Sequence, residues 1–491
     1  MKKLVIIFGV LTGMVFSAHS GGLVTNSNQS ASYYRMLARG ASTTGDAVYY
    51  NPAGLAFLED GFTLSLNTQM IWMKRIINND FPDLKRHLDS SGKLREGEFV
   101  GNLYVPVFPG IYAAYKTGNW AFSLGFNPPA GGGSIEFKEG IPMLELPVCV
   151  LPGYVTQLGI PTQNYSVNSM MKGMSIVYAV QAGVSYKINE VLALSGGVRM
   201  MFASNSYEGY LKDIKINPTI PGLLDGSMLG ASDLDTKGNE FNAMADALGQ
   251  DHAQYMQLKT LAGGLKQLAA GIPGNTELDV KQSGRGVAPI LGLHYKKDGL
   301  NLAVKYEFKT KITLKNETSK NALNMYPDKQ ELRSDIPAVL SLAGSFEIVP
   351  SLRLSLTYLN HFEKQAVIES WSPDNTLPKG GTIVERQNFI NSGTIEYQAG
   401  LEWMIGDKFT LSAGCQWSDV DVKETWHNDI THNLDNFTLG IGAQYKFGER
   451  LSLNLGGLNT WYTPVTIDNS VYKQTYDREN KAIALGIEYR F

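Results

Sequence analysis

Hydrophobic and polar residues alternate along most of this chain, in segments of about 10 to 16 residues. Leu300, Leu302 and Val304 occupy even positions, and polar residues such as Asn301 and Lys305 occupy the odd positions between them. Residues 437–447 show the same alternation in the opposite parity. A period of two predicts β-strands with one apolar and one polar face. A soluble sandwich also alternates, but it seldom needs strands this long.

Fourteen such segments can be counted in the sequence, and an even number is typical of a closed bacterial outer-membrane barrel. Closure also removes the exposed edges of a long sheet. The predicted strands are 61–75, 103–116, 119–127, 174–187, 191–212, 283–297, 300–316, 334–349, 352–368, 393–405, 408–424, 434–447, 450–463 and 481–491. The predicted fold is therefore all-β, a 14-stranded antiparallel transmembrane β-barrel.

Short and long connections alternate between these segments. The short ones are turn-forming pairs: Thr117-Gly118, Asn189-Glu190, Asp298-Gly299, Pro350-Ser351, Gly406-Asp407 and Gly448-Glu449. Every other connection is long, up to about seventy residues after the fifth segment. This alternation predicts periplasmic turns and extracellular loops, with both mature ends of the chain in the periplasm.

The first twenty residues have the features of a secretory signal. Met1-Lys2-Lys3 precedes the apolar run 4–16, and Ala18-His19-Ser20 supplies a small-x-small cleavage pattern. The alternative is a membrane anchor, but the run is shorter than the ~20 residues of a spanning helix. We expect residues 1–20 to be the signal, 21–60 a segment preceding the barrel, and 61–491 the barrel. A Gram-negative outer membrane is the expected location.

The composition disfavours several classes of protein and kinds of site. Aromatic residues make up 10 % of the chain and charged residues only 18 %, which suits aromatic girdles and an apolar outer surface. The net charge is −3, which becomes −5 without Lys2 and Lys3, and this disfavours binding to nucleic acid. Two cysteines, Cys149 and Cys415, are too few for a disulfide framework or a four-ligand zinc site, and the sequence leaves open whether they pair. We expect no metal and no cofactor.

Three segments lie outside the predicted strands. Residues 21–60 are polar and glycine-rich, and could form a plug or a loose periplasmic tail. Residues 233–270 carry apolar residues at helical spacing and predict two short amphipathic helices in an external loop. Residues 128–172 are unusually apolar for an external loop, which indicates either a binding surface or packing on a neighbouring loop.

The motifs of residues 31–55 give a family resemblance. Ala31 to Gly40 (ASYYRMLARG) and Gly45 to Leu55 (GDAVYYNPAGL) resemble the hatch of the FadL family of outer-membrane transporters, with Asn51-Pro52-Ala53 as the most specific part. Asp335-Ile336-Pro337, which opens the eighth predicted strand, resembles a recurrent family segment. The terminal aromatic Phe491 resembles the signal for the barrel-assembly machinery.

The resemblance implies passive transport of long-chain fatty acids or aromatic hydrocarbons. It implies a hatch at 21–60, an apolar surface groove between residues 128–172 and 217–282, an internal site, and a lateral exit where the third strand kinks inward. The third predicted strand carries Gly125 and ends at Asn127-Pro128-Pro129, so it either kinks or simply ends. We expect Asn51-Pro52-Ala53, a compact turn, to pack beside Gly125 to Pro128 and to hold the exit in shape.

The family's fatty-acid transporters hold the carboxylate with basic lumenal residues. By parity the lumen of this chain receives Arg199, Lys305, Lys309, Arg333 and Arg353. Each is a candidate ligand for a carboxylate, and each could instead pair with Glu307, Asp335 or Glu347. We expect Arg333 and Asp335 to project inward near the extracellular end.

Other functions fit the sequence less well. A general diffusion porin needs an open wet channel, which a forty-residue plug and apolar loops oppose. An outer-membrane lipase or protease is disfavoured because the sequence contains no His-Glu-x-x-His, no Gly-x-Ser-x-Gly and no recognisable triad. An adhesin has only a long external loop in its favour. The expected partners are a hydrophobic small molecule, outer-membrane lipid and the assembly machinery, and the expected state is a monomer.

Overall fold

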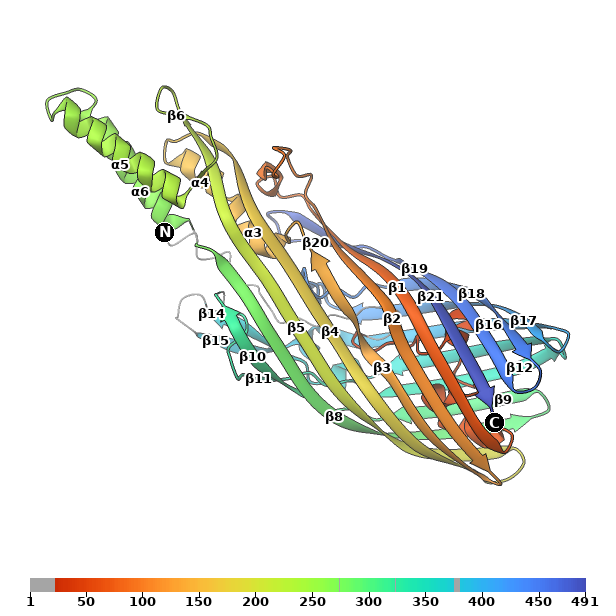
Figure 1. Ribbon diagram of the computed structural model, residues 1–491. Coiled ribbons are helices and arrows are strands. Elements are labelled where there is room, and N and C mark those ends of the chain that lie inside the picture. Colours follow the sequence, from red (N-terminus) through yellow and green to blue (C-terminus); the bar gives the residue numbers. More distant parts are fainter. Residues whose placement is uncertain (1–22, 273, 323, 375–379) are drawn as a thin grey trace.

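The computed structural model describes residues 23–272, 274–322, 324–374 and 380–491, so the expected signal lies outside the described residues. Across this part of the chain, fourteen antiparallel strands form a closed barrel, as the periodicity predicts (Figure 1). Each strand pairs with its neighbours in sequence, and the pairing of the first strand with the last closes the wall, for example at Leu66 and Ile487. Short turns lie at one end of the barrel, the turn end, and long loops at the other, the loop end.

Three of the fourteen strands are interrupted and consist of two pieces each. In order, the strands are β1 (Gly61–Asn79), β2 (Glu98–Thr117), β3 (Trp120–Phe137), β4 (Thr162–Lys187), β5 (Leu192–Ile220), β8 (Thr276–Lys297), β9 with β10 (Leu300–Glu307, Thr313–Asn321), β11 with β12 (Glu331–Arg333, Val339–Val349), β13 (Leu352–His361), β16 (Ile390–Ile405), β17 (Phe409–Val422), β18 (Asn436–Phe447), β19 with β20 (Leu451–Tyr462, Val465–Asp468) and β21 (Lys473–Arg490).

The remaining elements lie inside the barrel or in its loops. The strands are β6 (Leu224–Asp225), β7 (Leu229–Gly230), β14 (Glu369–Asp374) and β15 (Gly380–Glu385), and the α-helices are α1 (Ala31–Met36), α2 (Ala47–Tyr50), α3 (Pro142–Cys149), α4 (Leu151–Gln157), α5 (Ala231–Leu248) and α6 (Tyr255–Gly271). The 3-10 helices are η2 (Pro52–Phe57), η3 (Leu84–Arg86), η4 (Glu363–Gln365), η5 (Arg386–Phe389) and η6 (Glu424–Trp426).

The two faces of the wall have opposite polarity, and the polar one is inside. Along β1, Ser65, Asn67 and Gln69 are buried, whereas Leu66 and Met70 are exposed. The outward face also carries a belt of aromatic side chains in neighbouring cross-strand positions: Tyr358, Tyr397, Trp417, Phe437 and Trp461. An outer surface of this kind suits lipid contact, and aromatic belts are typical of membrane interfaces.

The strands differ from their predicted lengths mainly at the loop end. β4 begins at Thr162, β5 continues to Ile220 and β21 begins at Lys473, all beyond the segments with clear alternation. Where both faces of a strand are polar, the period-two pattern disappears although the ladder of hydrogen bonds continues. Asp335-Ile336-Pro337 does not open the eighth strand but interrupts it between β11 and β12, because a proline cannot donate to the ladder.

The N-terminal segment, residues 23–60, fills the interior of the barrel towards the turn end (Figure 1). Its helices α1 and α2 are entirely buried. At the other end of the molecule, α5 and α6 form a hairpin that extends away from the barrel, which confirms the predicted helical insertion. No helix among the described residues combines the length and the hydrophobicity needed to cross a membrane.

Candidate functional site

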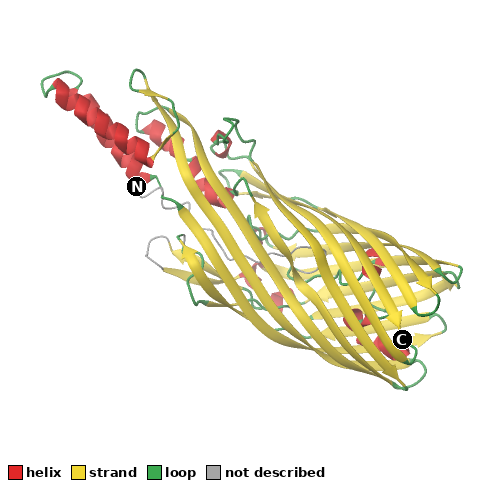
Figure 2. Ribbon diagram, in the orientation of Figure 1, coloured by secondary structure: helices red, strands yellow, loops and turns green. Residues whose placement is uncertain are grey.

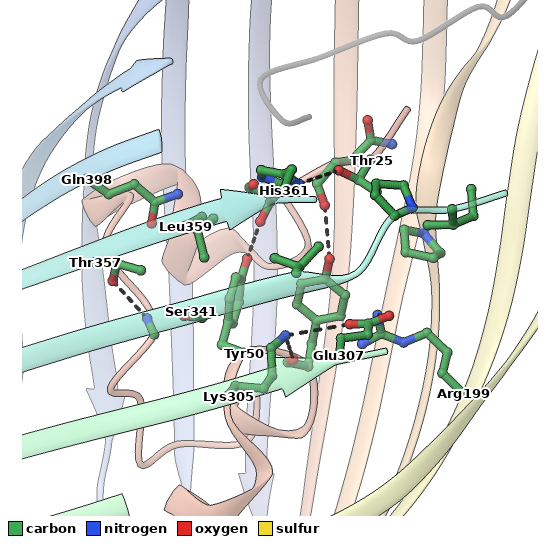
Figure 3. A pocket seen from close by; sticks show the side chains of 18 of the residues that line it. Thr25, Tyr50, Arg199, Lys305, Glu307, Ser341, Thr357, Leu359, His361 and Gln398 are labelled. Atoms are coloured by element: carbon green, nitrogen blue, oxygen red, sulfur yellow. Dashed lines mark hydrogen bonds and ion pairs between the residues drawn. The ribbon is translucent and has the colours of Figure 1, made fainter. Parts of the chain in front are cut away.

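A small cavity lies inside the barrel between the N-terminal segment and the wall (Figure 3). Its volume is about 50 Å³, which is room for a few water molecules. The lining combines hydroxyl groups, tyrosine rings and aliphatic side chains with charged groups from the wall. The residues are Thr25, Asn26, Ser27, Gly40, Tyr49, Tyr50, Pro129, Arg199, Met201, Lys305, Glu307, Ile336, Pro337, Val339, Ser341, Thr357, Leu359, His361 and Gln398.

Two of the predicted lumenal cations, Arg199 and Lys305, meet in this cavity. Arg199 forms an ion pair with Glu307, and its Nε donates to Gln181 at 3.0 Å. Lys305 Nζ donates to the carbonyl of Tyr49 at 3.0 Å and lies 3.9 Å from Glu307. Both cations also lie over the ring of Tyr49, at 4.7 and 4.9 Å from its centroid. Glu307 is therefore the one carboxylate within ion-pair distance of either cation among the described residues.

The other three predicted cations lie elsewhere. Arg333 holds Asp335 with two nitrogens, Nη2 at 2.7 Å from Oδ2 and Nε at 3.0 Å from Oδ1, and Lys309 lies 3.9 Å from the same carboxylate. Asp335 projects inward as expected and is fully buried, but the side chain of Arg333 is 31 % exposed. Arg353 lies at the turn end and pairs with Glu347 at 2.7 Å. These three cations do not line the cavity.

Helix α1 of the N-terminal segment is seated on a patch of inward-facing glycines. A Cβ on Gly414 would lie 2.0 Å from the carbonyl oxygen of Met36, and one on Gly400 would lie 2.2 Å from the same atom. On Gly440 and Gly456, a Cβ would lie 2.4 and 2.6 Å from backbone atoms of α1. Only glycine permits this approach of two backbones, and the four glycines lie at the inward parity of β16, β17, β18 and β19. The sequence shows a glycine at an inward position of each of these strands, but only the register between the strands shows that the four glycines form one patch.

Two polar clusters fix the N-terminal segment. Arg35 of α1 forms an ion pair with Glu402 of the wall, at 2.6 Å. Asp46 accepts hydrogen bonds from Ser42 at 2.6 Å, from Arg39 at 2.8 and 2.9 Å, and from two further hydroxyl groups. Burial opposes the charge of Asp46, but Arg39 and these donors outweigh it and lower the pKa to about 2. The cluster thus stays ionised and locks the turn between α1 and α2.

The predicted position of Asn51-Pro52-Ala53 is wrong. The turn packs against β4 and β8: Ser185 donates to the carbonyl of Pro52 at 2.6 Å, and Asn51 donates to the carbonyl of Leu293 at 3.2 Å. Asn51 also caps η2 by accepting from the Ala53 backbone at 3.3 Å. Gly125 instead faces Val48 and Tyr112. The misplacement arose because local turn chemistry does not indicate which strand a buried turn will face.

The third strand does not end at Pro128 but continues to Phe137. Its pairing with β2 stops at Ile111 and Phe126, and resumes only at Leu103 and Ile135. Bulges in the pairing with β4 follow Asn127 and Gly131, where prolines and glycines disturb the ladder. The wall is therefore interrupted between β2 and β3, and of the two alternatives left open by the sequence, a strand that ends at Pro128 is excluded.

Gln29 of the N-terminal segment fills this interruption. Its side chain donates to the carbonyl of Pro128 at 3.1 Å and accepts from Asn127 at 2.8 Å, while its own carbonyl accepts from Tyr112 at 2.8 Å. Next to it, the backbone of Asn26 donates to the carbonyl of Pro129 at 2.8 Å. Nothing in the sequence singles out Gln29, because a lone glutamine between asparagine and serine gives no signal.

The apolar loop between β3 and β4 packs against β4, β5 and η3 of the neighbouring loop rather than presenting a free surface. Ile141, Val148 and Cys149 are fully buried, and neither Cys149 nor Cys415 forms a disulfide. Glu145 of α3 anchors the loop: it accepts from Ser169 at 2.6 Å and pairs with Arg95 at 2.5 Å. Burial would raise the pKa of Glu145, but His87 and Arg95 outweigh it, so the pKa is lowered.

The described residues offer no metal centre. No group of three or more His, Cys, Asp or Glu side chains in this part of the chain is placed to hold a metal ion. The features that could act on a ligand are the cavity with its two cations, the buried N-terminal segment and the interruption between β2 and β3.

Comparison with known proteins agrees with this architecture. No family model matches the chain, and no curated protein matches it in sequence. Among solved structures, a Pseudomonas aeruginosa FadL homologue superposes with a TM-score of 0.62 at 14 % identity, over 96 % of this chain and 100 % of that one. The Pseudomonas putida toluene transporter TodX superposes with a TM-score of 0.54 at 16 % identity, over 98 % and 100 %. These similarities show that the chain has the fold of the FadL-type outer-membrane transporters.

Proposed function

We propose that this chain, which has the FadL-type barrel fold, is a passive outer-membrane transporter of hydrophobic or amphipathic small molecules. In this proposal residues 21–60 act as the hatch and the interruption between β2 and β3 is the lateral exit. The contacts of Gln29 are the observation that carries the proposal, because one hatch residue bonds to both sides of the interruption. Movement of the hatch would break these bonds and open the wall towards the membrane.

Long-chain fatty acids are the proposed substrate class. Arg199 and Lys305 share the single carboxylate of Glu307, so their side chains carry one positive charge in excess. A buried cation in excess favours an anionic group, and hydrogen bonds from a guanidinium to a carboxylate are among the strongest in proteins. The small cavity would have to enlarge around the alkyl chain, which again requires the hatch to move.

An aromatic hydrocarbon is the second candidate substrate. The cavity is flanked by Tyr49 and Tyr50 and has Met201 and Ile336 in its lining, a surface that suits a neutral ring. The fold similarity to a toluene transporter is in keeping with this candidate. A general diffusion porin is disfavoured because the N-terminal segment fills the lumen where a porin has an open channel.

A reversible disulfide across the exit tests the gate. In a background of Cys149→Ser and Cys415→Ser, the pair Thr25→Cys and Ala130→Cys replaces two residues that lie directly opposite each other in an antiparallel bridge between the N-terminal segment and β3. Oxidation should stop uptake of a labelled fatty acid into cells or proteoliposomes, and dithiothreitol should restore it. The matched control is Thr438→Cys with Thr460→Cys, two wall residues that touch at 2.9 Å across β18 and β19 and tether nothing movable.

Equal transport by the oxidised and reduced exit pair would contradict the lateral exit. Swelling of liposomes in sugars at the rate of a porin would contradict the proposed transport class. To separate the two substrate candidates, Arg199→Gln should weaken uptake of a fatty acid and leave toluene uptake unchanged. Mass spectrometry of small molecules that co-purify in mild detergent would identify the natural ligand. A monomeric state and dependence on the barrel-assembly machinery remain predictions.

A further inference from the structure

The loop between β17 and β18, residues 423–435, folds into the barrel instead of standing above it. Trp426, Ile430 and Leu434 are buried to 2 % exposure or less. We name this segment the inner loop. On its outer side, the carboxylate of Asp429 accepts from the backbone of Met143 in α3, at 2.6 Å. On its inner side, Asn433 donates to the carbonyl of Leu23, at 3.2 Å.

The inner loop therefore links two parts of the molecule that otherwise lie apart. Met143 belongs to the apolar loop between β3 and β4, at the loop end of the barrel. Leu23 is the first described residue of the hatch. A displacement of the inner loop would thus change contacts of both the external loop and the hatch.

Two arginines of the wall hold the inner loop in place. Arg75 of β1 and Arg478 of β21 are direct cross-strand partners, and their exposed fractions are 2 % and 4 %. Arg75 donates to the carbonyl of Ile430, and Arg478 donates to the carbonyl of His432. Like charges in directly opposite positions of a sheet destabilise it, and here the pair is also largely removed from water.

The site has unused hydrogen-bonding capacity beside Arg478. Among the described residues, Nε of Arg478 has no hydrogen-bond partner, and neither does either amide atom of Asn480. Asn480 lies two residues along β21 on the same inward face, and its exposed fraction is 1 %. A buried donor without a partner costs free energy, so these groups favour a ligand with acceptor oxygens.

A carboxylate fits this site better than the carbonyl groups that occupy it now. A carbonyl oxygen carries only a partial charge, whereas a carboxylate supplies two acceptor oxygens and one full negative charge. Hydrogen bonds between a guanidinium and a carboxylate are roughly twice as strong as those between neutral groups. The full charge would also relieve the repulsion between Arg75 and Arg478.

We propose that Arg75, Arg478 and Asn480 form a second binding site for the carboxylate of an amphiphilic ligand. The inner loop occupies this site with the carbonyl oxygens of Ile430 and His432 until a ligand displaces it. The site is distinct from the cavity at Arg199 and Lys305, which lies on other strands of the wall. Binding at the arginine pair releases the inner loop and so loosens its contacts to α3 and to the hatch. This inference rests on the proposed transport of amphiphiles.

The test measures binding and loop release with the full-length protein in detergent micelles. The probes are a fluorescent fatty acid and its methyl ester, which has the same chain but no charge. Arg478→Gln should weaken binding of the acid about tenfold or more and leave the ester unchanged. Asn480→Asp, which is nearly isosteric, should weaken the acid in the same way by placing a negative charge at the site. The matched control is Lys74→Gln, which removes a cation from the outward face of β1 next to Arg75.

A cysteine in the inner loop reports on its displacement. In the Cys149→Ser, Cys415→Ser background, Ile430→Cys should react slowly with a maleimide, and the acid but not the ester should accelerate the reaction. If both site variants fold and bind the acid like the wild type, or if the acid leaves the labelling rate unchanged, the second site is refuted. If, in addition, the wild type takes up neither the acid nor the ester in proteoliposomes, the proposed transport function is refuted as well. If the wild type does take up the ligands but the site variants bind the acid normally, only the second site is refuted and the transport function stands.

Discussion

The seat of α1 on the wall can be perturbed with a single methyl group. In Gly414→Ala, the new Cβ would lie 2.0 Å from the carbonyl oxygen of Met36 and 2.5 Å from its carbonyl carbon. Real Cβ contacts below 3.0 Å essentially never occur, so α1 and the wall must separate by about 1 Å. The ion pair between Arg35 and Glu402, now 2.6 Å long, would be stretched beyond hydrogen-bonding distance by a movement of that size.

The expected cost follows from these contacts. Overpacking by a methyl group typically costs about 1–3 kcal/mol, and α1 relieves it by leaving its seat. The state with α1 packed on the glycines should therefore lose about 1–3 kcal/mol relative to the state with α1 detached. This changes the ratio of the populations of the two states by roughly 5- to 150-fold. The barrel itself should stay folded, because the two largest overlaps are with α1, and the approach to the wall, 2.9 Å to the carbonyl oxygen of Ala399 in β16, is only slightly too short.

Hydrogen exchange followed by mass spectrometry measures this opening. Peptides that cover residues 31–37 should exchange faster in Gly414→Ala by about the same factor, while peptides from the strands remain protected. The matched control is Gly457→Ala in β19, two strands away, where the nearest atom to the new Cβ is a carbonyl oxygen at an ordinary 3.7 Å. Identical exchange of residues 31–37 in the two variants would refute the glycine seat. Faster exchange throughout the strands would mean that the substitution destabilises the barrel instead.

Three further outcomes follow from the structure. The lowered pKa of Glu145 means that its ion pair stabilises the loop junction at neutral pH and loses this effect as the pH falls below about 4. The Tm difference between wild type and Glu145→Gln should therefore shrink from pH 7 to pH 3.5, and a constant difference would contradict the assignment. Arg333→Glu should weaken uptake of acid and neutral ligands alike, because Arg333 chelates Asp335 and does not reach the cavity; a selective loss for the acid in paired uptake assays would show direct binding. Deletion of Phe491 should lower the heat-modifiable folded band on a gel, since its backbone donates to Phe62 at 2.8 Å and its ring packs on Phe62 at 5.4 Å; an unchanged yield in the membrane would count against the terminal signal.

Replacing Asn51-Pro52-Ala53 with three glycines tests whether this turn contributes to gating. The turn caps η2 and bonds to β4 and β8, so the variant should loosen the hatch against that side of the wall. We expect folded protein in normal yield with transport reduced severalfold, measured by uptake of a labelled fatty acid. Loss of the folded band would identify the motif as a stability element, and wild-type uptake would exclude a role in gating.

The sequence alone determined the barrel, because strand alternation and turn chemistry are local properties. The number of strands, the alternation of turns and loops, and the inward position of Lys305 and Arg199 all follow from a period of two and a few turn pairs. The helical insertion followed in the same way from apolar residues at helical spacing.

Tertiary structure decided which inward residues meet. Parity placed five cations inside the barrel but could not tell that Arg199 and Lys305 share Glu307 while Arg353 lies at the turn end. The seat of α1, the position of Gln29 in the wall and the inner loop on Arg75 and Arg478 each join residues far apart in the chain. Gln29 lies 99 positions from Pro128, and Arg75 lies 355 positions from Ile430. Local patterns fix the face on which a side chain lies, whereas its partner depends on how the barrel closes and how the hatch packs inside it.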